Sequence, residues 1–442
     1  MLQTAHWIYD PLGERDICPA FRRDFAVQKA VAKATLYASA RGVYEAFIND
    51  TRLGEQVMTP GWTTYEARTQ YQEYDVTALL GAENVLKLRT ASGWYKGFEG
   101  HWTELPPSAA NRQNAVIAAL YLVFVDETTQ TIVTDEEWQV ADSEYRFCSI
   151  YHGCIYDATV EPVYERYAVL VENDDKSMLI PQEGELILTH ERLAPIAVIR
   201  TPKGETVLDF GQNLTGSVAL SLNAKAGDKI ALSFAEILDG DGNFYNANYR
   251  RAKCLYEYTC RDGYQEFMPT LTFYGFRYVR VDAYPGEVDS DAFRAVVIHS
   301  QMKRTGHFEC SDPLINQLYS NVIWGQRGNY LDIPTDCPQR DERLGWTGDA
   351  QIFLRTAAYN YDVRKFFYKW LRDMIAAQRD NGGIPVVIPD MVGGGDYFAA
   401  AWSDAVAIIP WELYRAYGDT SFMQMMFPAM KRWNDYVKNV TP

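Results

Sequence analysis

The sequence has 442 residues, 47% of them hydrophobic, so it exceeds the size of one ordinary domain and can bury more than one core. The formal charge of −16 leaves no basic surface to neutralise phosphates; this argues against nucleic acids and anionic membranes as partners and favours a neutral ligand. Seven cysteines without a C-x-x-C pair, no bilayer-length apolar run and no secretory signal at the start predict a cytoplasmic protein with reduced thiols.

From about residue 30 to about residue 300, short runs alternate apolar and polar residues, which is typical of β-strands. In "KIALSF", for example, Ile230, Leu232 and Phe234 fall on one face. Strands at this spacing, over this length, predict two antiparallel sandwiches with a boundary in the acidic stretch near residues 171 to 185. We expect an N-terminal segment at 1–29, a first β-sandwich domain at 30–175 and a second at 176–302.

After about Lys303 the apolar period changes from two to nearly four. Leu314, Ile315 and Leu318 line one face of a predicted helix, with Ser311 as a candidate N-cap. Further helices with broad apolar faces follow at short intervals. Such helices need many neighbours, so we predict that 303–442 opens a helical barrel or solenoid that is part of a larger all-α domain.

The run "DIPTDCPQRDERLGWTGDAQ", residues 332–351, lies between two predicted helices and is therefore a loop. One interpretation is a solvated loop in which carboxylates offset Arg340 and Arg343. The alternative is a binding site, because an indole beside several carboxylates suits a polyhydroxylated ligand. A carboxyl desolvated by Trp346 would have a raised pKa and could act as a general acid, whereas Arg340 lowers the pKa of whichever acid it pairs with. The sequence leaves that pairing open.

The same run resembles the signature of the bacterial α-L-rhamnosidases, and five of its residues stand at the family's spacing: Asp336, Arg340, Glu342, Trp346 and Asp349. The segments "GWYKG" at 93–97, "DFGQNLTG" at 209–216 and "FYGFRYVRV" at 273–281 resemble parts of the family's β domains. The resemblance implies two antiparallel β-sandwich domains followed by the N-terminal part of an (α/α)6 barrel, so that 303–442 would be an incomplete catalytic domain. It also implies hydrolysis of terminal α-L-rhamnose residues with inversion of configuration.

The resemblance also assigns roles to these residues. Glu342 would be the general acid, and Trp346 would pack on the sugar. The rhamnose hydroxyls would be held by Asp336, Arg340 and Asp349. Trp402 and Asp404, in "AAWSDA" after the glycine-rich "GGGDYF", would contact the substrate, with core packing and helix capping as the alternatives.

Two positions depart from the family pattern. Cys154, in "HGCIYDA", stands where the family carries a glutamate, and the neighbouring His152 is better interpreted as a packed residue than as a ligand. No position matches the motif of the family's general base, and Glu412, the only glutamate after Glu342, has no motif support. We therefore expect this chain to lack the base.

The predicted partner is a rhamnose-containing glycoside, with no metal, no organic cofactor and an open oligomeric state. Two other functions remain as alternatives: a carbohydrate-binding protein without hydrolysis, and β-sandwiches that serve in assembly or adhesion.

Overall fold

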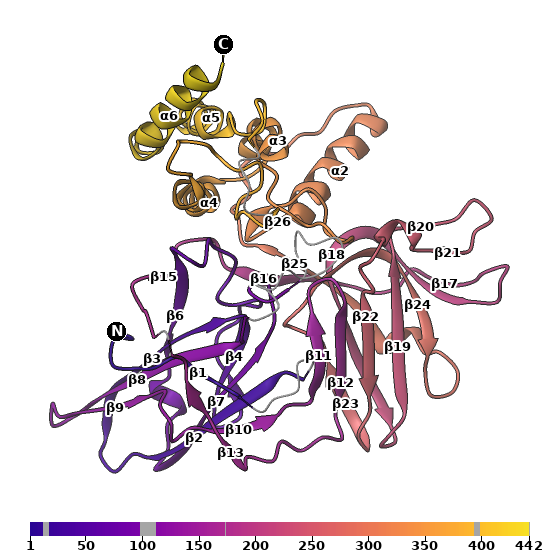
Figure 1. Cartoon of the computed structure of the whole chain (residues 1–442). Coiled ribbons are helices and arrows are strands. Elements are labelled where there is room, and N and C mark those ends of the chain that lie inside the picture. The colour runs from indigo at the N-terminus through magenta and orange to yellow at the C-terminus, as the bar shows by residue number, and fades with distance from the viewer. Residues whose placement is uncertain (12–16, 98–111, 173, 393–397, 442) are drawn as a thin grey trace.

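The computed structural model describes residues 1–11, 17–97, 112–172, 174–392 and 398–441, and Figure 1 shows two β regions with the helices gathered on one side of them. No described helix combines the length and the apolarity needed to cross a membrane. The predicted order of β-rich domains followed by the start of a helical domain is confirmed.

The first β region consists of two facing sheets. One has the order β14-β1-β8-β3-β6-β15 with β9 beside β8, and the other has the order β13-β10-β2-β7-β4-β5. Buried side chains from both sheets, among them Leu36 and Leu120 of one and Phe21 and Leu88 of the other, form a common core. The strands are β1 (Ile8–Tyr9), β2 (Pro19–Ala26), β3 (Val31–Arg41), β4 (Val43–Ile48), β5 (Thr51–Arg52), β6 (Thr69–Asp75), β7 (Glu83–Ala91), β8 (Ala115–Phe124), β9 (Thr129–Val133), β10 (Gln139–Asp142), β13 (Arg166–Tyr167), β14 (Val169–Leu170) and β15 (Leu179–Pro181), with a short helix η1 (Thr77–Leu79).

The second β region is a ten-stranded sheet with the order β11-β12-β22-β19-β24-β18-β25-β16, in which β17 and β23 also pair with β18. Its strands are β11 (Tyr145–Ser149), β12 (Gly153–Asp157), β16 (Ile187–Leu193), β17 (Ala197–Arg200), β18 (Thr206–Ala224), β19 (Lys229–Ala235), β22 (Leu255–Thr259), β23 (Gly263–Phe267), β24 (Tyr274–Ala283) and β25 (Phe293–Ser300). A small ribbon of β20 (Ile237–Leu238) and β21 (Phe244–Tyr245) and the short helices η2 (Ala247–Tyr249) and η3 (Ser290–Ala292) complete the region.

The predicted alternation appears in β19, where Ile230, Leu232 and Phe234 are all buried. The hairpin β11–β12 lies before residue 176 in the chain but joins this second sheet through a parallel pairing of β12 with β22. The domain boundaries at 30–175 and 176–302 stay predictions.

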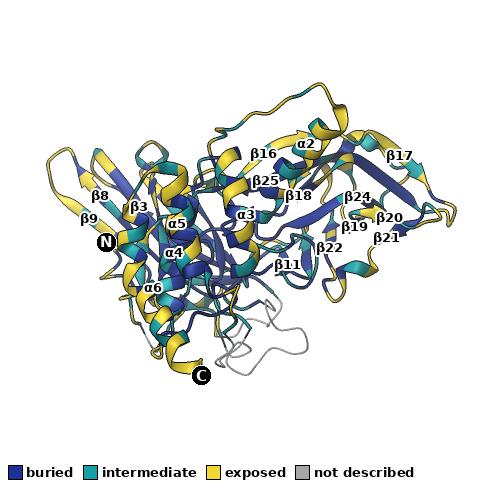
Figure 2. Ribbon diagram, turned by 90° about the horizontal axis from the view of Figure 1, so that it is seen from above, coloured by how far each residue is buried: buried dark blue, intermediate teal, exposed yellow. Residues whose placement is uncertain are grey.

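Five described helices follow: α2 (Pro313–Asn329), α3 (Thr347–Asn360), α4 (Arg364–Ala377), α5 (Ala405–Tyr417) and α6 (Ser421–Val440). The first begins one residue later than Ser311 would set it, because Asp312 is the N-cap and accepts a 2.8 Å hydrogen bond from the backbone nitrogen of Leu314. On α2 the predicted apolar face is open to solvent, with Leu314 78% and Leu318 62% exposed, as the yellow outer surfaces in Figure 2 illustrate.

One hydrophobic cluster runs without interruption from the second β region into the helices. Buried Phe276 and Ile298 of the sheet belong to the same cluster as Ile333, Leu354 and Trp370. The segment between α2 and α3, which carries the hairpin β26 (Tyr330–Leu331) and β27 (Ile333–Pro334), is therefore held between two packed bodies. Such support fixes the side chains of a loop in place.

Candidate active site

The loop from Thr335 to Trp346 is anchored to the second β region by a buried arginine. Arg343 is 1% exposed, and its guanidinium donates to the backbone oxygens of Ile150 (2.9 Å) and Phe273 (3.1 Å) in that region. It is therefore a structural anchor and not the solvated counter-ion of a charged surface loop. The solvated-loop interpretation does not fit this residue.

A close backbone approach strengthens the anchor. A Cβ atom on Gly275 of β24 would lie 2.9 Å from side-chain atoms of Pro338 and Gln339, so only glycine lets the loop settle this near the strand. The phenol of Tyr151 also donates to the backbone oxygen of Glu342. These contacts determine where the carboxylates of the loop point.

Glu342 accepts hydrogen bonds on both carboxylate oxygens. Its Oε1 accepts from the indole nitrogen of Trp346 at 3.0 Å, and its Oε2 accepts from Arg250 at 2.7 Å and from Arg340 at 3.0 Å. Burial opposes ionisation, but the hydrogen bond and charge of Arg250, together with those of Arg340, outweigh it and lower the pKa of Glu342. Without a ligand, the carboxyl group is ionised.

Asp336 behaves in the opposite way. Its side chain is only 8% exposed, its Oδ1 accepts from the backbone nitrogen of Leu344 at 2.8 Å, and Arg340 lies 3.4 Å from its Oδ2. Burial, with a contribution from the charge of Glu342, raises the pKa of Asp336 to about 6. Arg340 therefore bridges two carboxyl groups whose pKa values are shifted in opposite directions.

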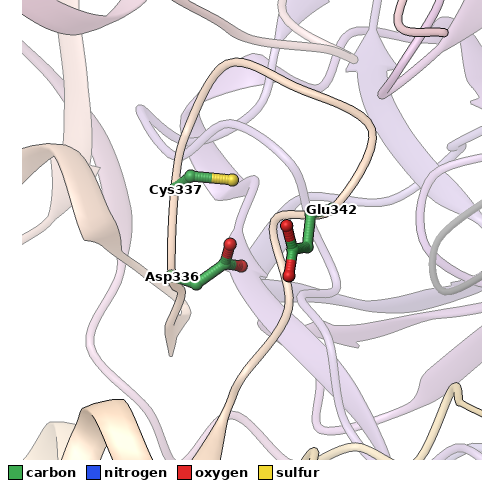
Figure 3. A group of neighbouring side chains, drawn as sticks. All are labelled: Asp336, Cys337 and Glu342. Atoms are coloured by element: carbon green, nitrogen blue, oxygen red, sulfur yellow. The ribbon is translucent and has the colours of Figure 1, made fainter. Parts of the chain in front are cut away.

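Figure 3 shows Asp336 and Glu342 facing each other beside the thiol of Cys337. One donor atom from each of the three lies within 4.8 Å of the others, which is close enough to hold a metal ion. Three N–H donors already occupy the two oxygens of Glu342, two of them on guanidinium cations, and burial raises the pKa of the Cys337 thiol. The three groups suit a pair of acids bridged by Arg340 better than a cation site, since a cation would meet positive charge.

A cavity of about 600 Å³ opens next to this acid pair. Among the predicted residues, Asp336, Asp349 and Trp402 line it, while Arg340, Glu342, Trp346 and Asp404 do not. Asp349 lies in the first turn of α3, and burial and the charge of Glu342 raise its pKa. The volume falls within the range of about 300–1,000 Å³ that is typical of small-molecule sites.

The indole of Trp402 packs directly against Gly348, and both residues line the cavity. A Cβ on Gly348 would lie 2.8 Å from ring atoms of Trp402, so a larger residue there would displace the ring. Trp402 is 40% exposed, which leaves part of it open to a ligand. Trp346 is instead half-buried, and its indole nitrogen is engaged by Glu342.

The remaining predicted positions lie apart from the cavity. Asp404 precedes α5, and its two oxygens accept from the indole nitrogen of Trp433 (2.9 Å) and the backbone nitrogen of Ala401 (2.8 Å). Cys154 is a buried thiol in β12, and the pKa of His152 falls to about 4 through burial and the nearby Lys253. In the glycine-rich "GGGDYF" segment, residues 393–397 lie outside the described residues.

Arg250 is the site residue that the sequence did not reveal. It follows η2 in the second β region, 92 positions before Glu342, inside the unremarkable run "NYRRAK". Two adjacent arginines in a β-rich region carry no signal of where their side chains point. Only the three-dimensional structure shows that Arg250 lies against the acidic loop.

Three family models match the chain. The α-L-rhamnosidase N-terminal domain matches residues 29–183, the bacterial α-L-rhamnosidase concanavalin-like domain matches 199–299, and the bacterial α-L-rhamnosidase 6 hairpin glycosidase domain matches 303–442. Together they account for most of both β regions and all of the helices.

Curated relatives match along nearly the whole chain. An α-L-rhamnosidase of Streptomyces avermitilis is 38% identical over 94% of this chain and 41% of its own length. One of Formosa agariphila is 35% identical over 97% of this chain and 49% of its own. The chain thus spans less than half the length of these relatives.

Solved structures agree with this match. The S. avermitilis α-L-rhamnosidase complexed with L-rhamnose superposes with a TM-score of 0.91 at 36% identity, covering 97% of this chain and 42% of the other. The native enzyme from Aspergillus terreus gives 0.93 at 34% identity, covering 98% and 52%.

Proposed function

Since the chain belongs to the bacterial α-L-rhamnosidase family, we propose that it carries the acid side of a site that hydrolyses terminal α-L-rhamnosides with inversion. The observation that supports this most is the acid pair Asp336–Glu342 at the edge of a sugar-sized cavity. The S. avermitilis relative was solved in complex with L-rhamnose, which supports the choice of sugar.

We assign the general acid to Glu342. Its proton passes to the glycosidic oxygen as the bond from that oxygen to C1 of the sugar breaks, and water attacks C1 from the opposite face while a base takes a proton from that water. In the unliganded protein Glu342 is ionised, so it takes up a proton before each turnover. Trp346 and Arg340 orient its carboxyl group.

The cavity lining holds the sugar in this proposal. Asp349 accepts from rhamnose hydroxyls, and Asp336 either donates or accepts because its pKa is about 6. Arg340, which does not line the cavity, holds Asp336 and Glu342 in place beside it. Trp402 covers an apolar face of the ring. Asp404, whose oxygens are both engaged within the fold, supports the turn that carries Trp402 and does not touch the sugar.

We assign the general base to no described residue. Inverting glycosidases separate their two carboxyl groups by about 6.5–9.5 Å, whereas Asp336 and Glu342 share one arginine on one loop and have oxygens within 4.8 Å. Glu412 pairs with Arg415 at 3.0 Å and lies 3.9 Å from Arg355. We propose that the base belongs to the part of the relatives' length that this chain does not match.

Because no described residue is assigned as the base, a second candidate also stands: a protein that binds rhamnosides without cleaving them. A cytoplasmic location, the exclusion of nucleic acid and membrane partners, and the oligomeric state stay untested predictions.

The test combines binding and turnover. Calorimetry measures the affinity of the chain for L-rhamnose, and release of p-nitrophenol from p-nitrophenyl α-L-rhamnoside measures catalysis. If the chain turns over, Glu342→Gln should lower kcat by about a thousandfold while L-rhamnose affinity stays within about threefold, because the amide keeps the size but cannot give a proton. The matched control is Glu309→Gln, an exposed glutamate in the same region, which should change neither.

Each outcome decides a part of the proposal. Binding without turnover supports the second candidate and the absence of a base. Turnover that survives in Glu342→Gln removes Glu342 from the acid role. Product of retained configuration, followed by proton NMR of the released sugar, would contradict inversion and point to Asp336 as a nucleophile. Failure to bind L-rhamnose would reject the sugar assignment.

A further inference from the structure

Arg250 joins the second β region to the acidic loop by two ion pairs. Its Nε lies 3.0 Å from Oδ1 of Asp341, and its Nη2 lies 2.7 Å from Oε2 of Glu342. The two nitrogens of one planar guanidinium thus engage two neighbouring carboxylates of the loop. A guanidinium held at two points has a fixed orientation, which a single contact would not give.

The backbone around Arg250 is held in an uncommon shape. Arg250 has φ +57° and ψ −111°, a left-handed φ that non-glycine residues rarely adopt. On one side the phenol of buried Tyr249 donates to the backbone oxygen of Gly275 at 2.5 Å, and on the other the nitrogen of Arg251 donates to Oδ2 of Asp341 at 3.4 Å. The fold therefore sustains a strained residue in order to point this side chain at the loop.

Glu342 is surrounded by charged and titratable groups from three elements. The loop itself contributes Arg340, Asp336, Asp341 and Cys337, α3 contributes Asp349, and the second β region contributes Arg250. Arg340 divides its charge between Asp336 and Glu342, whereas Arg250 does not contact Asp336. Of the two arginines, Arg250 is therefore the one that contacts Glu342 without also contacting Asp336.

We propose that Arg250 is a positioning residue through which the β region orients Glu342 and determines when that carboxyl carries a proton. The inference rests on the acid role proposed for Glu342 and deepens it. The contacts that define this role are those of Arg250 with Glu342 and Asp341, and Arg250 is not among the residues that line the cavity. With its side chain 45% exposed, it can leave Glu342 without opening the core, after which Glu342 takes a proton from solvent.

The hydrogen bond from Trp346 to Glu342 supplies a direct reporter. The chain has 11 tryptophans, so the indole N–H signals in a ¹H–¹⁵N spectrum are few, and Trp346→Phe identifies the one that contacts Glu342. In the native sequence this signal should change with a midpoint below 4.5, the ordinary pKa of glutamate. In Arg250→Gln the midpoint should rise by about one pH unit or more, because an adjacent cation lowers a carboxyl pKa by about 1–3 units.

Two further variants separate a positioning role from a structural one. Arg250→Lys keeps the charge and should return the midpoint most of the way. Arg251→Gln removes the adjacent, exposed arginine and should leave the midpoint where it is. An unchanged midpoint in Arg250→Gln, in a protein that still melts as the native one does, would overturn the proposal, as would an equal shift in Arg251→Gln.

A last variant keeps this test apart from the test of function. Glu342→Gln should abolish the titration of the Trp346 signal whether or not the chain turns over substrate. If that titration is abolished and Arg250→Gln shifts it, the Arg250 proposal stands even if rhamnoside hydrolysis fails. If Glu342→Gln abolishes hydrolysis but Arg250→Gln leaves the midpoint of the Trp346 titration unchanged, only the Arg250 proposal is rejected.

Discussion

Two clusters of charged side chains lie along the segment between α2 and α3, and they differ in their access to water. The buried cluster, at the start of the segment, consists of Asp332, Lys369, Asp373 and Arg68, whose side chains are between 0% and 8% exposed. The cavity cluster, further along the segment, consists of Asp336, Arg340, Glu342 and Arg250, with the two arginines 36% and 45% exposed. Similar residue types thus serve two different purposes.

The charges of the buried cluster are paired with one another inside the protein. The ammonium of Lys369 lies 2.9 Å from Oδ2 of Asp332 and 3.6 Å from Oδ2 of Asp373, and it also donates to the backbone oxygen of Trp62. Arg68 of the first β region pairs with Asp373 at 2.8 Å. These buried ion pairs hold the first β region, the segment between α2 and α3, and α4 together. They are not accessible to a substrate. The cavity cluster keeps the exposure that chemistry needs.

The largest effect is expected where the buried cluster loses its cation. Lys369→Met would leave Asp332 and Asp373 buried beside each other with only Arg68 nearby, which should cost about 3–5 kcal/mol of unfolding free energy in urea titrations. The matched control is Lys365→Met one turn earlier on α4, where the lysine is 54% exposed and 3.7 Å from Glu185; it should cost less than about 1 kcal/mol. Equal costs would show that burial does not distinguish the clusters.

The second effect comes from the pH dependence of the cavity cluster. In the folded protein the pKa of Asp336 is about 6, against an ordinary value of 3.8, so the folded state holds this proton more tightly than the unfolded chain does. The resulting stabilisation is complete below about pH 4 and is lost as the pH rises through about 6, an effect of about 3 kcal/mol.

Asp336→Asn removes that titration. Between about pH 4 and about pH 7 the native protein should lose stability relative to this variant, in urea unfolding measured at several pH values. Asp380→Asn, at an exposed aspartate, serves as the control and should follow the native curve. Parallel curves for the native protein and Asp336→Asn would contradict the raised pKa.

The third effect concerns the ligand wall of the cavity. Trp402→Ala removes the partly exposed indole that lies against Gly348 and should weaken L-rhamnose binding about fivefold, since an aromatic face contributes about 1 kcal/mol to such a contact. Trp411→Ala, at a tryptophan that is 48% exposed on α5 and does not line the cavity, should leave calorimetric affinity unchanged. Equal losses would mean that the pocket has been misplaced.

The sequence predicts the local part of the cavity cluster and misses the rest for a physical reason. Asp336, Arg340 and Glu342 lie within seven consecutive positions of the sequence, so their proximity follows from chain connectivity. Arg250 is 92 positions away in the sequence and is brought to Glu342 by the fold of the second β region. The sequence of a strand does not show which other strand it pairs with, so this contact could not be predicted. The lowered pKa of Glu342 depends in part on Arg250 and was therefore equally out of reach of the sequence.

The fold shows the same division. The change of apolar period near Lys303 correctly predicts strands before helices, because period reflects local geometry. It also marks the face of α2 that carries Leu314 and Leu318, yet it does not say whether a partner covers that face, and both side chains are exposed. Asp332 is a further case: within a run of acids it resembles its neighbours, and only the position of Lys369 makes it a buried anchor.

The smallest effect concerns Asp404, which lies near the cavity but, like the buried cluster, has its oxygens engaged within the protein. Asp404 lies two positions from Trp402, but its oxygens serve Trp433 and the backbone of Ala401, as in the buried cluster. Asp404→Ala should cost about 1 kcal/mol of stability, because it removes the acceptor of two hydrogen bonds within the fold, although the side chain does not cap α5. If Asp404 only supports Trp402, L-rhamnose affinity should fall less than in Trp402→Ala, and the double variant should bind no worse than Trp402→Ala alone. Additive losses of affinity would instead make Asp404 a direct sugar contact and extend the cavity cluster onto the start of α5.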